Sequence, residues 1–555
     1  MFQGDIQDML DKVTVGEVVS TFLEQCGVGA AFGVISIHNM PFLDAIGRRK
    51  NIRFIASRGE AGAVNMADAY ARVGERLGVV FTSTGVAAGN AAGSLIEAQT
   101  AGTPLLHITG QIETQHLDKN HAYIHEARDQ LKMLKAVSKS AYRVTSSETA
   151  LSIFKEAVQE AMTPPMGPVS IEIPINIQQA QLDCPRDFTP LPILSKAPEQ
   201  NQVVKLAKSL SLAKRPLLWL GGGARQASEA VMRLIKMGFG IVTSVQGRGI
   251  IPEDHPASLG AFNMFSSIEN FYSTCDAMVV VGSRLRGNET LKYKLKLPSP
   301  MYQIDIDPSA ENGRPYIANH FLLGDSKLTL ESLADHLEGK LSVDSRFIDD
   351  IAKARYDAEI FMRSGLGPYE KLMDSIGKTF DENFIWVRDV TISNSTWGNR
   401  GVIISKSNHG VHALGGGIGH GLQMAIGAAI ASPEMDIVCL VGDGGLQVNI
   451  GELATAIQEG VKITLLLMNS HDYEVIKNIQ KADYGGRIYF SDIYTPDFHG
   501  IANSNGWDYQ KLSNMNSINE TLKQARSNPK SIMIELDMPE IGPFTRAFGG
   551  PPVKK

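Results

Sequence analysis

The stretch Ile437-Val438-Cys439-Leu440-Val441-Gly442-Asp443-Gly444-Gly445-Leu446-Gln447 is the most informative part of this sequence. Its five leading apolar residues predict a buried strand, and the glycines behind them predict a turn into a helix over residues 449–459. A second apolar run, residues 463–468, ends at Asn469. The 24 residues between Gly444 and Asn469 suit one helix and one strand. We therefore expect two neighbouring parallel strands joined by a helical crossover.

The same alternation of apolar runs with amphipathic, helix-like stretches extends along the chain and predicts an α/β fold of doubly wound parallel sheets. Two breaks divide it: a proline-rich segment over residues 182–202 and a charged, helical segment over residues 337–367. We expect three domains, residues 1–183, 200–335 and 368–540, close to the prior of about 150 residues per domain. The predicted strands begin near residues 31, 53, 79, 105, 216, 240, 277, 301, 384, 437, 463 and 531.

Composition excludes several classes of protein. The chain of 555 residues is 43% hydrophobic and 20% charged, as in an ordinary globular protein. Its net charge of −6 offers no basic surface for nucleic acid. Its four scattered cysteines form no CxxC pair, which favours a reduced, cytoplasmic setting. The opening MFQGDIQDML lacks the basic and apolar segments of a signal peptide, and no apolar run is long enough to span a membrane.

The glycine-rich turn predicts an anion and metal site. Gly442, Gly444 and Gly445 allow the backbone to approach an anion, and the first N–H groups of the following helix point at it. Asp443 supplies a carboxylate oxygen, and Asn469 stands at the end of the next strand. Mg²⁺ prefers such oxygen ligands together with phosphate oxygens. The alternative is a plain strand–turn–helix with a capping aspartate.

This segment resembles the thiamine diphosphate (ThDP) motif of ThDP-dependent enzymes, which reads GDG, some two dozen residues, then usually Asn-Asn. The chain reads Asn469-Ser470 instead. The resemblance implies Asp443, Ser470 and the backbone carbonyl of Asp472 as Mg²⁺ ligands, with Asn469 or a water as a substitute for the serine. A serine hydroxyl is a shorter and poorer ligand than an amide oxygen. Asp472 also stands where many relatives carry glycine, so this loop departs from the family twice.

The segment Arg58-Gly59-Glu60-Ala61-Gly62-Ala63-Val64-Asn65-Met66-Ala67-Asp68-Ala69-Tyr70-Ala71-Arg72 resembles the matching segment of acetolactate synthases and benzoylformate decarboxylases. The resemblance implies that Glu60 is the carboxylate that bonds to the cofactor's aminopyrimidine ring and promotes its activation. We expect it at a strand end, before a helix over residues 61–72. Alternatively, Glu60 is only an acidic residue favoured at a helix N-terminus.

Further site residues follow from the same resemblance. The stretch from Thr82 to Gln111 is similar to that of acetolactate synthases, and Gln111 matches their active-site glutamine. Gly416 and Ile418 lie in a glycine-rich segment that resembles the loop carrying the bulky residue under the bent cofactor. Ile418 would be that wedge, and a buried core isoleucine is the competing interpretation.

Ser393 and Asn394 match the position where acetolactate synthases place polar side chains on the diphosphate. An ordinary polar turn is the competing interpretation. His38 follows the first predicted strand, where benzaldehyde lyase-like members carry a histidine that moves a proton at the substrate oxygen. A surface loop histidine explains it equally well.

The central domain carries Gly221, Gly222 and Gly223 after a strand. These glycines do not make a full GxGxxG pattern. In acetolactate synthases this domain binds FAD, and in other members it binds another nucleotide or nothing. FAD or nucleotide binding by this chain therefore stays open.

Together these features imply a ThDP- and Mg²⁺-dependent enzyme of the acetolactate synthase-like type, acting on 2-oxo acids as a decarboxylase or carboligase. Two alternatives remain: a C–C lyase or hydrolase that works without decarboxylation, like benzaldehyde lyase, and a non-catalytic or regulatory member with a weakened metal site. Family members place the cofactor between the N-terminal domain of one subunit and the C-terminal domain of another. The resemblance thus implies a homodimer as the minimal unit and favours a homotetramer. The sequence does not name the substrate.

Overall fold

A computed structural model describes residues 12–548 of the chain. The opening decapeptide, where we expected no targeting signal, lies outside the described residues. The described residues form two compact units. The first comprises the chain through Leu194 together with His412–Glu434 and Val448–Ile463, and the second comprises the remainder. Within residues 12–548, no helix combines the length and apolar character that crossing a membrane requires.

The first unit is built on a six-stranded sheet with the order β3-β2-β4-β5-β7-β6, which we call the N-terminal sheet. Every pairing in it is parallel. Its strands are β2 (Ala30–Gly33), β3 (Arg53–Ala56), β4 (Gly78–Thr82), β5 (Leu105–Gln111), β6 (Ser140–Arg143) and β7 (Pro168–Pro174). A short antiparallel pair, β1 (Lys12–Thr14) and β8 (Gln181–Asp183), lies beside it.

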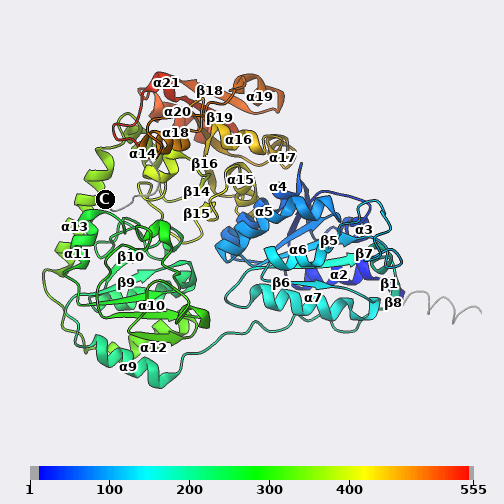
Figure 1. Cartoon of the computed structure of the whole chain (residues 1–555), viewed down its shortest axis with the longest axis horizontal. Helices are drawn as coiled ribbons and strands as arrows, with labels where there is room; N and C mark the ends of the chain where they lie inside the picture. Colours follow the sequence, from blue (N-terminus) through cyan, green and yellow to red (C-terminus); the bar gives the residue numbers. More distant parts are fainter. Residues whose placement is uncertain (1–11, 549–555) are drawn as a thin grey trace, which may run out of the picture. The chain divides into compact units, whose positions relative to one another are not determined.

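Helices cover both faces of the N-terminal sheet (Figure 1). They are α2 (Val15–Gln25), α3 (Met40–Arg49), α4 (Glu60–Gly74), α5 (Val86–Ala101), α6 (Gln130–Val137), α7 (Ser147–Met162) and α8 (Ile175–Gln178). Strands β4, β5 and β7 are buried along their whole length, as expected for a parallel sheet covered on both faces. Their side chains and those of α2, α3 and α7 form one hydrophobic core.

The second unit contains a central sheet with the strand order β10-β9-β11-β12-β13, again parallel throughout. Its strands are β9 (Pro216–Leu220), β10 (Gly240–Thr243), β11 (Ala277–Val281), β12 (Met301–Asp305) and β13 (His320–Leu323). Its helical segments are α9 (Gln200–Leu210), η1 (Gly222–Ala227), α10 (Ser228–Lys236), η2 (Val245–Gly247), α11 (Ser266–Tyr272), η3 (Gly287–Glu289), η4 (Pro308–Ala310), α12 (Ser326–Leu337) and α13 (Phe347–Arg363).

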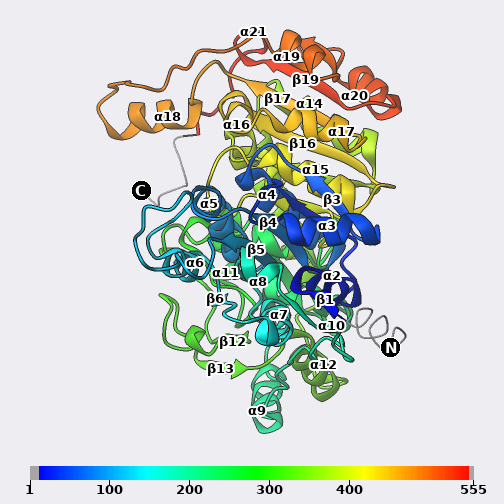
Figure 2. The same ribbon diagram turned by 90° about the vertical axis from the view of Figure 1, so that its right-hand side faces the viewer.

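The same unit contains a C-terminal sheet with the order β15-β14-β16-β17-β19-β18, parallel from β14 to β18. Its strands are β14 (Phe384–Arg388), β15 (Gly410–His412), β16 (Asp436–Gly442), β17 (Thr464–Asn469), β18 (Asp508–Leu512) and β19 (Ile532–Asp537). Its helical segments are α14 (Tyr369–Phe380), the π-helix η5 (Asn394–Gly398), α16 (Asp443–Val448), α18 (Glu474–Asp483), α19 (Phe498–Ser504), α20 (Ile518–Ser527) and α21 (Met538–Ile541). Helix α18 buries none of its residues and stands apart from this sheet in Figure 2.

The N-terminal and C-terminal sheets have the same topology. Numbered along the chain within each sheet, both strand orders read 2-1-3-4-6-5. In open α/β sheets, ligands bind beyond the carboxyl ends of the strands where the order reverses, here between strands one and three. That switch point lies between β2 and β4 in the N-terminal sheet and between β14 and β16 in the C-terminal sheet. The expected α/β fold with three parallel sheets is confirmed.

Two helices of the C-terminal sequence block belong to the first unit: α15 (Gly421–Ala431) and α17 (Glu452–Gln458). Helix α15 packs along α4, and the two lie side by side in Figure 2. The approach is close because Gly427 has no side chain: a Cβ there would lie 2.0 Å from the carbonyl oxygen of Met66. Almost every residue of both helices is buried. This contact joins the helix that begins at Glu60 to a helix more than 350 residues later in the chain.

The twelve predicted strands agree with the structure to within one or two residues at each end, whereas β1, β6, β7, β8, β13, β15 and β18 were not predicted. The expected helix over residues 449–459 is present but shorter, and a separate short helix precedes it. Helix α16 starts already at Asp443 and ends at Val448, and α17 runs only over Glu452–Gln458. The break between them contains Gly451, which disfavours helix, and Asn449, whose amide donates to the Gly419 carbonyl at 2.9 Å.

We predict that Gly427→Ala destabilises the protein by about 1–3 kcal/mol or more, because the added methyl group meets backbone rather than a movable side chain. Urea unfolding measures the change. Gly47→Ala in α3 is the matched control: its Cβ meets nothing within 4 Å, so the higher helix propensity of alanine should raise stability by up to about 1 kcal/mol. Equal effects of the two substitutions would contradict the close α4–α15 contact.

Candidate active site

Asp443 lies where the sequence predicted it, directly beyond β16 and at the start of α16. Its side chain is buried, and its Oδ2 atom has no hydrogen-bond partner. Burial raises the pKa of this carboxyl to about 6, against the lowering effect of the backbone N–H groups of Gly444 and Ser470. A buried carboxylate with an unused oxygen suits a cation ligand.

Three oxygen atoms meet at this point. The Ser470 hydroxyl lies 3.5 Å from Oδ1 of Asp443 and 3.0 Å from the backbone carbonyl oxygen of Asp472. The carboxylate of Asp472 turns away to Lys477, 2.8 Å from its Nζ. The backbone at His471, with φ of +61°, brings the Asp472 carbonyl round to the serine. The hydroxyl, carboxylate and carbonyl that the family resemblance implies as Mg²⁺ ligands thus lie close together.

Asn469 is engaged elsewhere. Its amide nitrogen donates to Glu535 at 2.9 Å, and its amide oxygen accepts from the His471 N–H at 3.3 Å. This arrangement favours Ser470 over Asn469 as the side-chain ligand. Within residues 12–548 no group of three or more histidine, cysteine, aspartate or glutamate side chains is placed to hold a metal ion. The donor set at Asp443 differs from such clusters because it combines one carboxylate with neutral oxygens, which suits Mg²⁺ shared with phosphate.

Ser393 and Asn394 lie beyond β14, on the other side of the switch point from Asp443. Both are buried, and neither Oγ of Ser393 nor Oδ1 of Asn394 has a hydrogen-bond partner. Buried polar atoms are normally paired. The two unpaired oxygens therefore favour a site for a polar ligand over an ordinary polar turn. Gly444 lies under Tyr473, since a Cβ would approach the tyrosine ring to 2.5 Å, and Gly445 completes the first turn of α16.

Glu60 is the first residue of α4 and follows β3. Its side chain is half-buried, and Oε2 accepts a hydrogen bond of 3.1 Å from the Asn90 amide. The second oxygen is therefore available to a donor from outside the chain. The expected helix start at residue 61 is correct to one residue.

Ile418 lies in the loop before α15, flanked by Gly416 and Gly419 with φ values of +89° and +86°. These left-handed conformations favour glycine, which explains the local composition. The isoleucine side chain is 37% exposed, so the alternative of a buried core residue is wrong for this chain. An exposed apolar residue held by two glycine bends fits the predicted wedge.

His38 lies beyond β2, at the switch point of the N-terminal sheet. It is only 7% exposed, so the alternative of a surface histidine is wrong. Its Nδ1 lies 3.5 Å from the Ser83 hydroxyl, which follows β4, and its ring meets the edge of His125 at a centroid distance of 5.2 Å. Burial, and then the neighbouring His125, lowers the pKa of His38, so the neutral imidazole predominates near pH 7.

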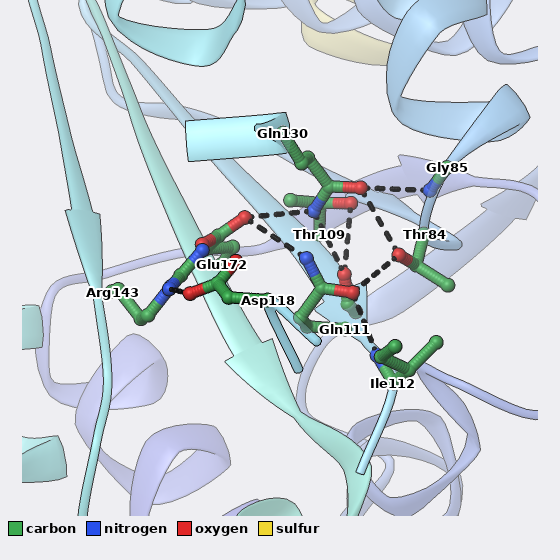
Figure 3. A network of polar contacts seen from close by, with 10 residues as sticks. Thr84, Gly85, Thr109, Gln111, Ile112, Asp118, Gln130, Arg143 and Glu172 are labelled. Carbon is green, nitrogen blue, oxygen red and sulfur yellow. Dashed lines mark hydrogen bonds and ion pairs between the residues drawn. The ribbon is translucent and has the colours of Figure 1, made fainter. Parts of the chain in front are cut away.

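Gln111 ends β5 inside a buried polar network (Figure 3). Its Oε1 accepts from the Thr84 hydroxyl at 3.0 Å and from the Ile112 N–H at 2.8 Å, and its Nε2 donates to Glu172 at 3.3 Å. One amide N–H of Gln111 remains available. The network therefore fixes the orientation of the Gln111 amide.

Two members of this network were missed by the sequence analysis. Gln130 accepts from the Gly85 N–H at 2.7 Å and donates to Glu172 at 3.0 Å, and Glu172 is also paired with Arg143 (Figure 3). Burial raises the pKa of Glu172, and Arg143 opposes that effect. The signal for Glu172 was present in the sequence: a carboxylate in the middle of an otherwise apolar strand needs internal partners.

The glycines of the central sheet are explained by packing. A Cβ at Gly221 would lie 2.2 Å from the Gly282 carbonyl oxygen, and one at Gly223 would lie 2.9 Å from the Gly282 Cα. The turns beyond β9 and β11 therefore touch each other, and this contact alone requires glycine.

Three family profiles match this chain. Residues 13–133 match the thiamine pyrophosphate enzyme N-terminal TPP binding domain, residues 203–333 the central domain, and residues 392–536 the C-terminal TPP binding domain. The chain belongs to the thiamine pyrophosphate enzyme family. Thiamine pyrophosphate is ThDP, so the cofactor expected from the GDG motif agrees with the family. The two TPP binding domains are those that carry the sheets of shared topology.

This ThDP enzyme is similar along most of its length to acetolactate synthases. It is 27% identical to a probable acetolactate synthase large subunit of Methanococcus aeolicus, covering 92% of this chain and 89% of the relative. It is 26% identical to an acetolactate synthase large subunit of Haemophilus influenzae, covering 96% and 95%. It is 28% identical to a probable 2-ketoarginine decarboxylase of Pseudomonas aeruginosa, covering 82% of each. The enzyme is therefore of the acetolactate synthase-like type.

We predict that Gln130→Leu destabilises the enzyme by about 2–4 kcal/mol, because the buried Gly85 N–H and the Glu172 carboxylate each lose a partner at roughly 1–3 kcal/mol per group. Chemical unfolding of the cofactor-free protein measures it. Gln115→Leu is the control, since Gln115 is exposed and bonds only to the nearby Glu113 side chain. If both substitutions proved neutral, the network of Figure 3 would not hold Gln111.

Proposed function

We propose that this chain is a ThDP- and Mg²⁺-dependent decarboxylase or carboligase that acts on 2-oxo acids. The observation that carries the proposal is that the Asp443, Ser470 and Asp472 oxygens meet across the switch point from the side-chain oxygens of Ser393 and Asn394, which have no hydrogen-bond partner. Support also comes from the similar acetolactate synthases and 2-ketoarginine decarboxylase, whose names denote reactions of 2-oxo acids.

The residues divide the work as follows. Asp443, Ser470 and the Asp472 carbonyl would hold Mg²⁺, and Ser393, Asn394 and the backbone of Gly442, Gly444 and Gly445 would bind the diphosphate. Bound ThDP supplies a nucleophilic carbon and an electron sink for decarboxylation.

Glu60 would hydrogen-bond the aminopyrimidine ring and hold a proton there, and Ile418 would pack against the cofactor. Gln111 offers its remaining N–H to the substrate, and His38 moves a proton at the substrate oxygen.

We propose a homodimer as the minimal active unit, with the cofactor between residues 1–183 of one subunit and residues 368–540 of another. A homotetramer built from two such dimers is the larger assembly we expect. FAD or another nucleotide in the central domain is not part of the proposal, because its glycines are explained by packing.

A second candidate is a C–C lyase or hydrolase that acts without decarboxylation. The position of His38 beside Ser83 and His125 favours it, because a buried neutral imidazole at the switch point can take a proton from an acyloin hydroxyl. Incubation with a panel of 2-oxo acids and acyloins separates the candidates. Release of carbon dioxide identifies the decarboxylase or carboligase, and release of aldehyde from acyloins alone identifies the lyase.

We predict that Glu60→Gln lowers turnover of the best 2-oxo acid by at least about a hundredfold at saturating ThDP and Mg²⁺, because a neutral amide cannot hold the proton at the aminopyrimidine ring. Steady-state carbon dioxide release measures it. Glu75→Gln, at the exposed C-terminal end of the same helix, should leave turnover within about twofold.

Unchanged turnover in Glu60→Gln would rule out the proposed mechanism. A comparable loss in Glu75→Gln would instead point to damage to α4 as a whole.

We predict that ThDP binds only with Mg²⁺, and that Asp443→Asn weakens this binding by more than about tenfold, or roughly 1.4 kcal/mol. Ser470→Asn should tighten Mg²⁺ binding, because the amide oxygen reaches further than the hydroxyl. Calorimetric titration of the cofactor-free protein measures all three. Asp483→Asn, at the exposed end of α18, is the control.

Lack of binding to the wild-type chain would support a third candidate, a non-catalytic member with a weakened metal site. Metal-independent binding would show that Asp443 has another role.

A further inference from the structure

Two buried glutamates of the first unit have no role in the site described so far. Glu97 lies in α5 and Glu452 opens α17, and each is about 2% exposed. A buried carboxylate is costly unless donors surround it. In both cases the donors are two consecutive backbone N–H groups that lie far away in the sequence.

Glu452 binds the turn that precedes Glu60. Its Oε1 accepts from the Arg58 N–H at 3.0 Å and from the Gly59 N–H at 3.2 Å. Its Oε2 accepts from the Thr455 hydroxyl at 2.5 Å, which fixes the carboxylate from its own helix. The glutamate thus reaches across 394 residues of chain to bond the two residues before Glu60.

This contact is made just ahead of the helix, because its donors are the N-cap residue Gly59 and the residue before it. Gly59 is the N-cap of α4 and has no side chain to accept a hydrogen bond from the helix. The Glu452 carboxylate instead holds the backbone at the cap, where the helix dipole favours negative charge. Because Glu60 is the first residue of α4, its Cα and the starting direction of its side chain follow from how this turn is held.

Gly62 makes room for the carboxylate. A Cβ at this position would lie 2.2 Å from Oε1 of Glu452 and 2.9 Å from its Cδ. Any side chain here would push the glutamate away while leaving α4 itself free of backbone clashes. Gly62 and Glu452 therefore form a matched pair.

Glu97 forms the counterpart on the other segment. Its oxygens accept from the Leu414 N–H at 2.6 Å and from the Gly415 N–H at 2.5 Å, at the start of the loop that carries Ile418. A Cβ at Gly415 would lie 2.8 Å from its Oε2. Arg72, which is paired with Asp68, also lies 3.3 Å from Glu97 and bonds the His412 carbonyl at 2.8 Å.

The two contacts run in opposite directions. Glu97, early in the sequence, binds the loop before α15. Glu452, late in the sequence, binds the turn before α4. Each uses a carboxylate, two adjacent N–H groups and a glycine. We call this pair of contacts the glutamate clasp.

We propose that Glu452 is a positioning residue that orients Glu60 toward the cofactor through the clasp. The proposal rests on the proposed function, since it assigns Glu60 its role at the aminopyrimidine ring. The only side-chain hydrogen bond to the Glu60 carboxylate within residues 12–548 comes from Asn90. A single bond leaves the glutamate free to swing about its own torsions, so the direction of the Cα–Cβ bond matters. That direction is what the Glu452 contact sets.

Four variants test the proposal. Glu452→Ala removes the acceptor, and Gly62→Ala displaces it without removing it. Glu452→Gln keeps an oxygen that can accept from both N–H groups. Glu459→Ala is the matched control, because Glu459 ends the same helix and pairs with Arg53 of β3 at 2.7 Å, away from the Glu60 turn.

The first readout is hydrogen exchange in the cofactor-free protein, followed on a peptide that covers residues 57–62. Exchange at Arg58 and Gly59 should rise by at least about tenfold in both Glu452→Ala and Gly62→Ala. It should stay near wild type in Glu452→Gln and Glu459→Ala. Unchanged exchange in the two alanine variants would overturn the clasp itself.

The second readout is the split between kcat and KM for the best 2-oxo acid. Both Glu452→Ala and Gly62→Ala should lower kcat by about tenfold or more while KM stays within about threefold, because Glu60 acts on the cofactor and not on the substrate. Glu452→Gln should recover most of kcat. A matching fall in thermal stability, without recovery by glutamine, would show a merely structural role and overturn the proposal.

Glu60→Gln distinguishes a failure of the positioning role of Glu452 from a failure of the proposed function. If Glu60→Gln is inactive while Glu452→Ala and Gly62→Ala keep full kcat, the positioning role of Glu452 is wrong and the proposed function stands. If Glu60→Gln keeps full turnover, the proposed function fails, whatever the exchange rates show.

Discussion

The close packing of α15 on α4 is the contact on which the first unit depends. It brings the helix that begins at Glu60 against the helix that follows the Ile418 loop, and it requires a glycine at position 427. Once two helices approach this closely, the turns at their ends lie near each other and need hydrogen-bond partners of their own. Glu452 and Glu97 supply them. The same contact therefore determines how the segments at Glu60 and Ile418 are held and why buried carboxylates are needed there.

The shared topology of the N-terminal and C-terminal sheets explains why the candidate residues come from so many places in the sequence. In both sheets the strand order reverses between the first and third strands, and polar residues follow those strands. Ser393 and Asp443 lie beyond strands of one sheet, and His38 and Ser83 beyond strands of the other. The same topology thus occurs twice, and we propose an anion and metal site at one switch point and proton-transfer groups at the other.

Much of this was predictable from the sequence because parallel strands leave a clear record. Buried runs such as residues 277–281 and 437–441 are continuous and apolar, and a polar residue directly after such a run lies at the ligand-binding edge. The placement of Glu60 and Asp443 followed from that rule together with the family resemblance. The start of the helix predicted over residues 449–459 was misplaced, because the break at Asn449 and Gly451 includes a tertiary contact between Asn449 and Gly419.

Contacts between distant backbone and side-chain atoms were beyond prediction for the same reason. Nothing in the local pattern around Glu452 distinguishes it from an exposed first-turn glutamate, since its partners are peptide N–H groups that any residue presents. Gln130 was hidden likewise, because a glutamine at a helix start is usually solvated. Glu172 was the exception, since a charged residue in a buried strand indicates that it has a buried partner.

The clasp also bears on how such a chain can evolve. Because the glutamate and the amides of each contact come from opposite ends of the sequence, neither TPP binding region can be exchanged for a foreign one without stranding a carboxylate in an apolar interior. Recombination at the linker after residue 183 would separate Glu97 from Leu414 and Glu452 from Arg58 at once. The two regions are therefore expected to be inherited together, as a single unit of descent, even though the chain connects them through an entire intervening domain.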